Sequence, residues 1–290
     1  MLTRQKILLR VMADSGGHCT KMQLAKLSFL LAREGRSDQL KTFYEFVPYL
    51  YGPYSFTLNH ELDNLVRSGL LLLPTDEKLE LTKEGQKAVG SKLDARLLRD
   101  LELLEKNYGK LDQSRLVDEV YKKYPWFTLN SANKRKRNAT LTEAPCANYT
   151  IGYQGFQVDG LLNKLLETGI KTLVDTRSNP ISRRYGYHKS TLQKLCQKVG
   201  IKYEHLPELG IPSDWRQDLE SELAYSVLFE RYEKSVLRME REVIAKLSER
   251  VLSTPTAFLC RESNPCECHR SRLAGALQKL NSLPIVDIGV

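Results

Sequence analysis

One stretch of the sequence gathers the side chains that could do chemistry. Residues 260–270 read Cys-Arg-Glu-Ser-Asn-Pro-Cys-Glu-Cys-His-Arg. Thiols, an imidazole, carboxylates and guanidinium groups are concentrated here more densely than anywhere else in the chain. A thiol becomes a nucleophile when neighbouring cations or a helix N-terminus lower its pKa. This stretch therefore predicts a nucleophilic or anion-binding loop.

Two other interpretations of this loop stay open. Its three cysteines and one histidine could hold zinc, although they lack the paired C-x-x-C spacing of closed structural zinc sites. The cysteines could also be small core side chains, which suits Cys266 better than the polar residues 268–270. We predict no bound cofactor and keep zinc as the alternative.

The flanking segments indicate how a fold would position the loop. The apolar residues 256–259 predict a buried strand that ends at Cys260, and residues 271–277 predict a helix behind the loop. Residues 268–270 would then lie at a helix N-terminus, which favours anions. Ligands of open α/β sheets bind at the edge where the strands have their carboxyl ends.

A second polar group follows another predicted strand, residues 170–175. Asp175 and Arg177 stand at the end of this strand. Residues 149–290 alternate strands and helices with short connections, which predicts a parallel, Rossmann-like sheet in an α/β domain. In a parallel sheet, Asp175 and Arg177 would lie at the same edge as Cys260.

The candidate catalytic residues come from these two segments. We favour Cys260 over Cys268 as the nucleophile because it ends a strand, and Glu262 or His269 would act as acid or base. Arg177 would bind an anionic substrate with Arg270, and Asp175 would either take part in catalysis or orient Arg177. The predicted substrate-binding residues are Tyr153, Ser182, Arg183, Tyr187 and Glu208. The ring of Tyr187 would offer a face on which a base could stack.

Several motifs of residues 149–290 together resemble a bacterial family called domain of unknown function 488. They are Thr150-Ile151-Gly152-Tyr153, Val174-Asp175-x-Arg177-x-x-Pro180-x-Ser182-Arg183, Tyr203-x-His205-Leu206-Pro207-Glu208-Leu209-Gly210 and Cys260-x-Glu262 with Cys268-His269-Arg270. The resemblance implies a fold and a pocket more firmly than a reaction. The Asp-x-Arg strand end and the cysteine loop are also similar to rhodanese-like folds. The loop after Cys260 is longer than the rhodanese loop and holds additional thiols, so the persulfide transfer of rhodaneses cannot be assigned to this chain by analogy.

The first half of the chain predicts an α+β domain. Helical patterns over 3–13, 20–31 and 58–66 precede a hairpin of strands 70–73 and 78–81, which is the order of a winged-helix domain. Lys26 to Leu31, the segment Phe46 to Ser55 and the segment Glu61 to Leu65 resemble winged-helix-like domains of some bacterial antitoxin and YwgA-like proteins. A charged helix over 83–108 leaves homodimerisation open.

Charge points to a nucleic-acid partner for this half. The net charge is +9, and residues 1–140 carry 24 lysines and arginines against 17 aspartates and glutamates. The candidate phosphate contacts are Lys21, Lys26, Arg33 and Arg36 in the helices and Lys134, Arg135, Lys136 and Arg137 in a polar linker. These residues could equally form a solvated basic face. We predict a nucleic-acid-binding domain over 1–129, a linker over 130–148 and an α/β domain over 149–290.

Composition suggests a cytoplasmic protein. No apolar run reaches transmembrane length, and six dispersed cysteines suggest free thiols rather than a disulfide framework. The sequence favours an enzyme acting on a nucleic acid or nucleotide, a hydrolase or transferase, through the loop of Cys260. The alternative is a non-catalytic DNA-binding regulator whose α/β domain senses a small anionic ligand or the redox state.

Overall fold

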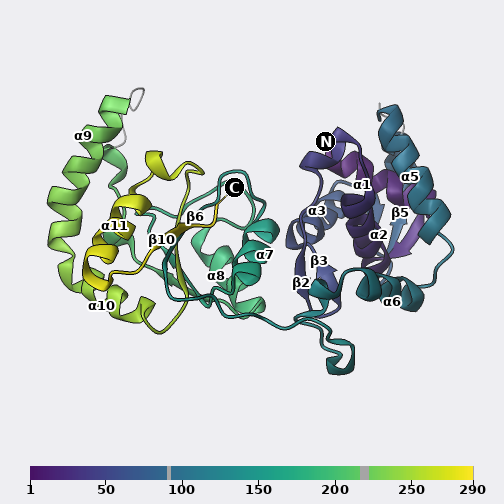
Figure 1. Cartoon of the computed structure of the whole chain (residues 1–290). Coiled ribbons are helices and arrows are strands. Elements are labelled where there is room, and N and C mark those ends of the chain that lie inside the picture. Colours follow the sequence, from purple (N-terminus) through teal and green to yellow (C-terminus); the bar gives the residue numbers. More distant parts are fainter. Residues whose placement is uncertain (90–92, 216–221, 290) are drawn as a thin grey trace. The chain divides into compact units, whose positions relative to one another are not determined.

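The computed structural model describes residues 1–89, 93–215 and 222–289. The chain forms two compact units, Met1–Thr140 and Leu141–Val290 (Figure 1). The first unit buries a large apolar cluster, and the second buries apolar side chains between its sheet and its helices. The site-bearing segments 170–177 and 256–270 both belong to the second unit.

Three helices and a small antiparallel sheet open the first unit. The elements are α1 (Thr3–Asp14), β1 (His18–Thr20), α2 (Lys21–Glu34), α3 (Phe56–Arg67), β4 (Leu71–Leu72) and β5 (Lys78–Leu81). The sheet order is β1-β5-β4. Thr20 caps the start of α2: its hydroxyl accepts a hydrogen bond from the Gln23 amide, and the Gln23 side chain accepts one from the Thr20 amide.

The aromatic segment between α2 and α3 forms a tight hairpin. It follows a 3-10 turn (Asp38–Thr42) and consists of β2 (Val47–Tyr49) and β3 (Gly52–Tyr54). Gly52 adopts φ 93°, a conformation that favours glycine and reverses the chain. The rings of Tyr49, Tyr54 and Phe56 contact one another, so these aromatic side chains pack the hairpin against the start of α3.

The predicted helix 83–108 is wrong as one element. The structure has α4 (Lys83–Val89) and α5 (Ala95–Tyr108), and residues 90–92 lie outside the described part. Asp94 starts α5 anew, because its carboxylate accepts a hydrogen bond of 2.7 Å from the Leu97 amide. The leucines at 97, 101 and 104 are buried in the unit's own core, so most of the face considered for dimerisation is already covered.

The unit ends with α6 (Gln113–Lys123) and two 3-10 turns, Pro125–Thr128 and Lys134–Lys136. The basic run of the predicted linker is exposed and contacts this unit. Lys136 pairs with Asp118, and Nε of Arg137 donates to the Ser131 carbonyl at 2.7 Å. The run is therefore partly held against the first unit.

The second unit is built on a five-stranded parallel sheet, which confirms the predicted α/β class. The strands are β6 (Asn148–Gly152), β7 (Thr172–Asp175), β8 (Lys202–His205), β9 (Thr256–Cys260) and β10 (Ile285–Asp287). Their order is β10-β6-β9-β7-β8, and every pairing is parallel. All residues of β6, β7 and β9 are buried, as expected for central strands covered on both faces.

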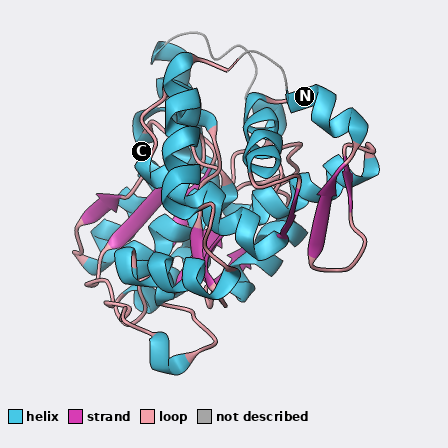
Figure 2. Ribbon diagram, turned by 90° about the vertical axis from the view of Figure 1, so that its right-hand side faces the viewer, coloured by secondary structure: helices cyan, strands magenta, loops and turns pink. Residues whose placement is uncertain are grey.

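Helices cover the two faces of this sheet (Figures 1 and 2). One layer holds α7 (Val158–Thr168) and α8 (Lys189–Lys198); the other holds α9 (Glu222–Tyr232), a π-helical turn (Glu233–Leu237), α10 (Arg241–Val251) and α11 (His269–Asn281). Val174 and Phe258 pack against this second layer. Residues 222–251 are helical in large part, and residues 216–221 lie outside the described part. Within the described residues, the helices lack the length and apolar character needed to cross a membrane.

Candidate active site

Three strand ends meet at one edge of the sheet. Strand β9 lies between β6 and β7, with Cys260 opposite Gly152 and Leu259 opposite Asp175. The expectation that the Asp175 strand and the Cys260 strand are neighbours with parallel carboxyl ends is confirmed. The loops that follow these strands therefore share one rim.

Close packing brings the cysteine loop over the end of β6. A Cβ atom at Gly152 would lie 1.8 Å from the carbonyl oxygen of Glu262, so no other residue fits at this position without moving the loop. The amides of Tyr153 and Gln154 donate to the carbonyls of Cys260 and Arg261, at 3.1 and 2.9 Å. These contacts place the loop directly above the sheet edge.

The Cys260 thiol lies beside an imidazole and a carboxylate. Its Sγ is 3.5 Å from Nδ1 of His269 and 3.1 Å from Oε2 of Glu262. Nε2 of His269 lies 3.2 Å from the carbonyl oxygen of Thr176, which can only accept a hydrogen bond. The Thr176 hydroxyl lies at the same distance from Nε2. With its proton on Nε2, the ring donates to the carbonyl, and Nδ1 then faces the thiol. This is the geometry of a cysteine-histidine pair oriented by a third group.

The pKa values of the two buried thiols in the loop, Cys260 and Cys268, are shifted in opposite directions. Burial alone would raise the pKa of Cys260, but hydrogen bonding from Cys268, together with His269 and Glu262, holds it well below the usual thiol value. Burial and the adjacent Cys260 raise the pKa of Cys268 well above that value. The structure thus favours Cys260 as the thiolate and Cys268 as the thiol that donates to it.

The same atoms include a possible metal-ligand set. Sγ of Cys260, Sγ of Cys268 and a ring nitrogen of His269 all lie within 4.8 Å of one another. Two thiolates and an imidazole are donors that suit zinc. Cys266, which completed the ligand set considered from the sequence, is exposed and lies outside this cluster.

Asp175 and Arg177 form a buried ion pair at the rim. Two guanidinium nitrogens of Arg177 donate to the two carboxylate oxygens of Asp175 at 2.8 and 2.5 Å, and Asp175 also accepts from the Tyr203 hydroxyl at 2.7 Å. Asp175 is fully buried, and Arg177 is 6% exposed. A carboxylate so placed fixes the guanidinium, which favours the orienting role for Asp175 over direct catalysis.

Arg270 is directed away from the position expected of it. Its guanidinium is fully buried and donates to the carbonyls of Glu262 and Ser263, the latter at 2.8 Å, and to Asp287 at 3.1 Å. These acceptors tie the cysteine loop to the end of β10. We therefore replace the predicted anion contact of Arg270 with a role in positioning the loop.

A pocket of about 500 Å³ opens beside these groups. Cys260 and Arg177 line it, together with Tyr153, Ser182 and Arg183 among the predicted substrate-binding residues. Tyr187 does not line it: the ring is fully buried and stacked on Tyr153 at a centroid distance of 4.2 Å, so it offers no free face to a base. Glu208 is exposed in the turn Pro207–Leu209 and is also absent from the lining.

The charge of the pocket is one-sided. Four arginines contribute to the lining, and among the described residues no aspartate or glutamate does; the arginines are Arg177, Arg183, Arg184 and Arg261. Such a lining favours an anion. The Cys260 thiol is only 1% exposed, so a substrate would reach it from within this pocket.

Comparison with known proteins identifies the segment that carries this site. Residues 157–277 match the family model described as Domain of unknown function DUF488. The DUF488 match contains the ion pair of Asp175 and Arg177 and the whole cysteine loop, whereas Tyr153 and Asp287 lie outside it. No curated protein and no solved structure matched the chain. The DUF488 match supports the family part of the resemblance and leaves the reaction to be inferred from the site.

Several contributors around the candidate site were missed from the sequence. Thr176 orients the histidine, Tyr203 holds Asp175, and Asp287 anchors the loop through Arg270. Arg184 and Arg261 add charge to the pocket. A sequence signal existed for most of them, because they follow or end the strands of the same sheet edge.

The predicted nucleic-acid contacts of the first unit separate into two groups. Lys26 is 3% exposed, and its Nζ donates to the Pro53 carbonyl at 2.9 Å, so it cannot reach a phosphate backbone on the surface. Lys21 is half-buried. Arg33 is exposed, with its guanidinium 5.2 Å from the centroid of the Phe127 ring, and residues 134–137 are exposed.

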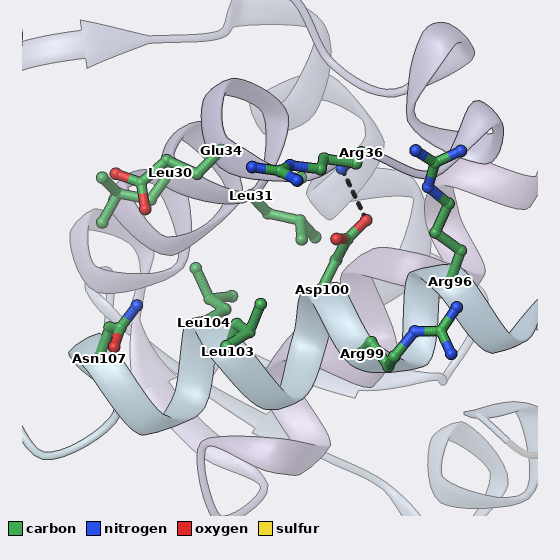
Figure 3. A pocket seen from close by; sticks show the side chains of 11 residues that line it. Leu30, Leu31, Glu34, Arg36, Arg96, Arg99, Asp100, Leu103, Leu104 and Asn107 are labelled. Carbon is green, nitrogen blue, oxygen red and sulfur yellow. Dashed lines mark hydrogen bonds between the residues drawn. The ribbon is translucent and has the colours of Figure 1, made fainter.

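Arg36 lies at a second hollow of about 450 Å³ in the first unit (Figure 3). Arg96 and Arg99 line the same hollow and are likewise exposed. Figure 3 shows the Arg96 and Arg99 side chains directed away from the leucines that form the apolar side of the hollow. The carboxylate of Asp100 accepts a hydrogen bond of 2.8 Å from the Arg36 amide. The Asp100 carboxylate therefore fixes the backbone at Arg36, and three exposed arginines line the hollow together with Glu34.

Replacing Asp175 with asparagine tests the buried ion pair. We expect the variant to lose about 3–5 kcal/mol of unfolding free energy, because Arg177 would keep a buried charge without its partner. Urea unfolding followed by circular dichroism measures this loss. The control is Glu143→Gln, which breaks the exposed pair with Lys171 and should cost less than about 1 kcal/mol. Equal losses in the two variants would contradict the assignment.

Alkylation across a pH series tests the thiol pair. In a chain with the exposed Cys146 and Cys266 replaced by serine, iodoacetamide should label Cys260 with a midpoint well below the value of about 8.5 that is usual for a free thiol. His269→Gln should move the midpoint upward, since the thiolate loses its partner. Peptide mass spectrometry locates the label. A midpoint near the usual value, or labelling that begins only after EDTA removes stoichiometric zinc, would count against a free thiolate.

Proposed function

We propose that the second unit is a thiol-dependent enzyme that acts on a nucleotide or a nucleic acid. One observation carries this proposal: a thiol with a histidine at 3.5 Å lies on the wall of a pocket that four arginines and no described carboxylate line. The arginines suit a phosphate-bearing substrate, because a guanidinium matches phosphate oxygens in pairs. The thiol supplies the nucleophile.

The residues divide the reaction between them. The proton of Cys260 passes to Nδ1 of His269 before substrate reacts, and the resulting thiolate Sγ then bonds to an electrophilic carbon or phosphorus atom of the substrate. The bond from that atom to its leaving group breaks, and the leaving group takes the electron pair and the proton from His269. Water then attacks the covalent intermediate and passes a proton to His269, and the bond to Sγ breaks to release Cys260 as the thiolate beside the protonated imidazole. A transferase would use another acceptor hydroxyl in place of water.

Neighbouring residues hold Cys260 and His269 in position. Thr176 fixes the imidazole through Nε2, and Arg270 holds the loop by its carbonyls. Arg177 is kept in place by Asp175 and faces the pocket, where Arg183 and Arg184 extend the basic lining. Glu262, 3.1 Å from the thiol, is a second acid or base for the same proton.

Cys260→Ser tests the proposed nucleophile. The full chain is incubated with nucleoside monophosphates, nucleoside triphosphates and single- and double-stranded oligonucleotides, and products are followed by mass spectrometry. Turnover should fall at least about 100-fold in Cys260→Ser, because a serine hydroxyl is a far weaker nucleophile at neutral pH. Cys266→Ser, an exposed change in the same loop, should retain full activity. Turnover that survives Cys260→Ser would refute the role.

A second function, a redox-sensitive regulator, is favoured by the pair of buried thiols. Sγ of Cys260 and Sγ of Cys268 lie within 4.8 Å. An oxidant such as hydrogen peroxide would accept two electrons and two protons as an S–S bond forms between them. Saturable binding of phosphate compounds without any product, together with a disulfide on mild oxidation, would favour this function over the enzyme.

We also propose that the first unit binds nucleic acid as a winged-helix domain. Helices α1 to α3 and the sheet β1-β5-β4 supply the elements of that arrangement. The exposed Arg33, the arginines of the Arg36 hollow and residues 134–137 supply positive charge. Phosphate contacts of this kind give an affinity that falls steeply with salt.

Salt titration of binding tests this interface. The association constant of the full chain for a DNA duplex should fall with rising salt, and Arg36→Ala combined with Arg135→Ala should reduce the slope by up to about 2, close to one unit for each lost phosphate contact. Lys202→Ala, which removes an exposed charge from the second unit, is the control and should leave the slope unchanged. An unchanged slope in the double variant would place the contact elsewhere.

A further inference from the structure

A separate cavity of the first unit surrounds the buried lysine. It has a volume of about 310 Å³ and lies among the start of α2, the β2-β3 hairpin and the start of α3. Its walls are mainly apolar and aromatic and include Met22, Leu58, Leu62, Tyr49 and Tyr54. This volume is at the lower end of the range of small-molecule sites.

Lys26 is the charged residue that the fold buries in this wall. The side chain is 3% exposed, and its Nζ donates to the Pro53 carbonyl at 2.9 Å. An ammonium group carries three donors, and this carbonyl is the acceptor found for it among the described residues. Nζ lies beside the hairpin turn, since a Cβ atom at Gly52 would be 3.4 Å from it, and Lys26 contributes to the cavity lining.

Burying the charged form of Lys26 costs free energy unless an anion binds to it. Burial lowers the pKa of Lys26 to about 7, since the apolar surroundings disfavour the charged form. The neighbouring titratable groups are the tyrosines of the hairpin and of α6 and, where the cavity reaches the surface, Lys21, Asp76 and Glu77. A methionine would fill the same space without this cost, so the amine is suited to a ligand that supplies the missing acceptors.

We propose that this cavity binds a small aromatic carboxylate, with the carboxylate on Nζ of Lys26 and the ring against the tyrosines and leucines. A carboxylate provides two acceptors and one negative charge, which matches a single ammonium. A phosphate carries more charge and requires more donors than this wall offers. The ring fits the apolar walls, where Tyr49 and Tyr54 already contact each other at 5.3 Å between centroids.

Two probes of equal shape test the proposal on the full chain. Phenylacetate carries the carboxylate, and phenylacetamide replaces it with a neutral amide. At pH 6 we expect calorimetry to show phenylacetate binding at least tenfold more tightly than the amide. The preference should decline as the pH rises above about 7, because the free lysine is then neutral and binding must take up a proton.

Lys26→Met supplies the matched variant. It should lose the preference for phenylacetate and retain the weaker binding of phenylacetamide, since the cavity keeps its shape. Equal affinities of the two probes in the wild-type chain, a preference that persists in Lys26→Met, or saturable binding of neither probe would overturn the proposal. The comparison of acid with amide in the wild-type chain across pH decides the matter even where the variant folds poorly.

Discussion

The parallel pairing of β9 with both β6 and β7 is the constraint on which the candidate active site depends. It places Cys260 opposite Gly152 and Leu259 opposite Asp175. These segments are far apart in the sequence, so only the sheet can bring them together. Because the strands are parallel, all three chains leave the sheet at one edge, and their loops must share that rim. Changing the register of β9 by one residue would turn the thiol to the other face.

The chemistry of the rim then follows from how its polar groups are satisfied. Burial would penalise each charged group, and the structure compensates by direct partners. Asp175 holds Arg177, and the carbonyls of the cysteine loop with Asp287 hold Arg270. These arginines differ in consequence, because Arg177 also lines the pocket whereas Arg270 does not. One guanidinium lines the pocket, and the other fixes the loop that carries the thiol.

The sequence was sufficient for much of this architecture and insufficient for side-chain direction. Apolar strands that each end in polar residues predicted that Asp175, Arg177 and Cys260 lie at one edge of the sheet. The prediction was possible because strands and helices with short connections permit few topologies. Directions at the start of α11 were not predictable: successive helical residues turn by about 100°, so His269 faces Cys260 while Arg270 faces Asp287. Lys26 was misplaced for a related reason, since only the long-range docking of the β2-β3 hairpin buries it.

The thiol and metal interpretations of the cysteine loop make opposite demands on the same protons. A metal held by both cysteines requires two thiolates and supplies the positive charge that keeps both deprotonated, whereas in the metal-free loop one thiol donates to the other. Cys260 is stabilised as a thiolate by donors, and Cys268 is the donor whose pKa burial raises. A closed metal site would also occupy Sγ of Cys260, the atom that reaches the arginine-lined pocket. The two interpretations therefore differ in the state of Cys268: nucleophilic chemistry uses it as a thiol that donates to Cys260, whereas a metal would hold it as a second thiolate.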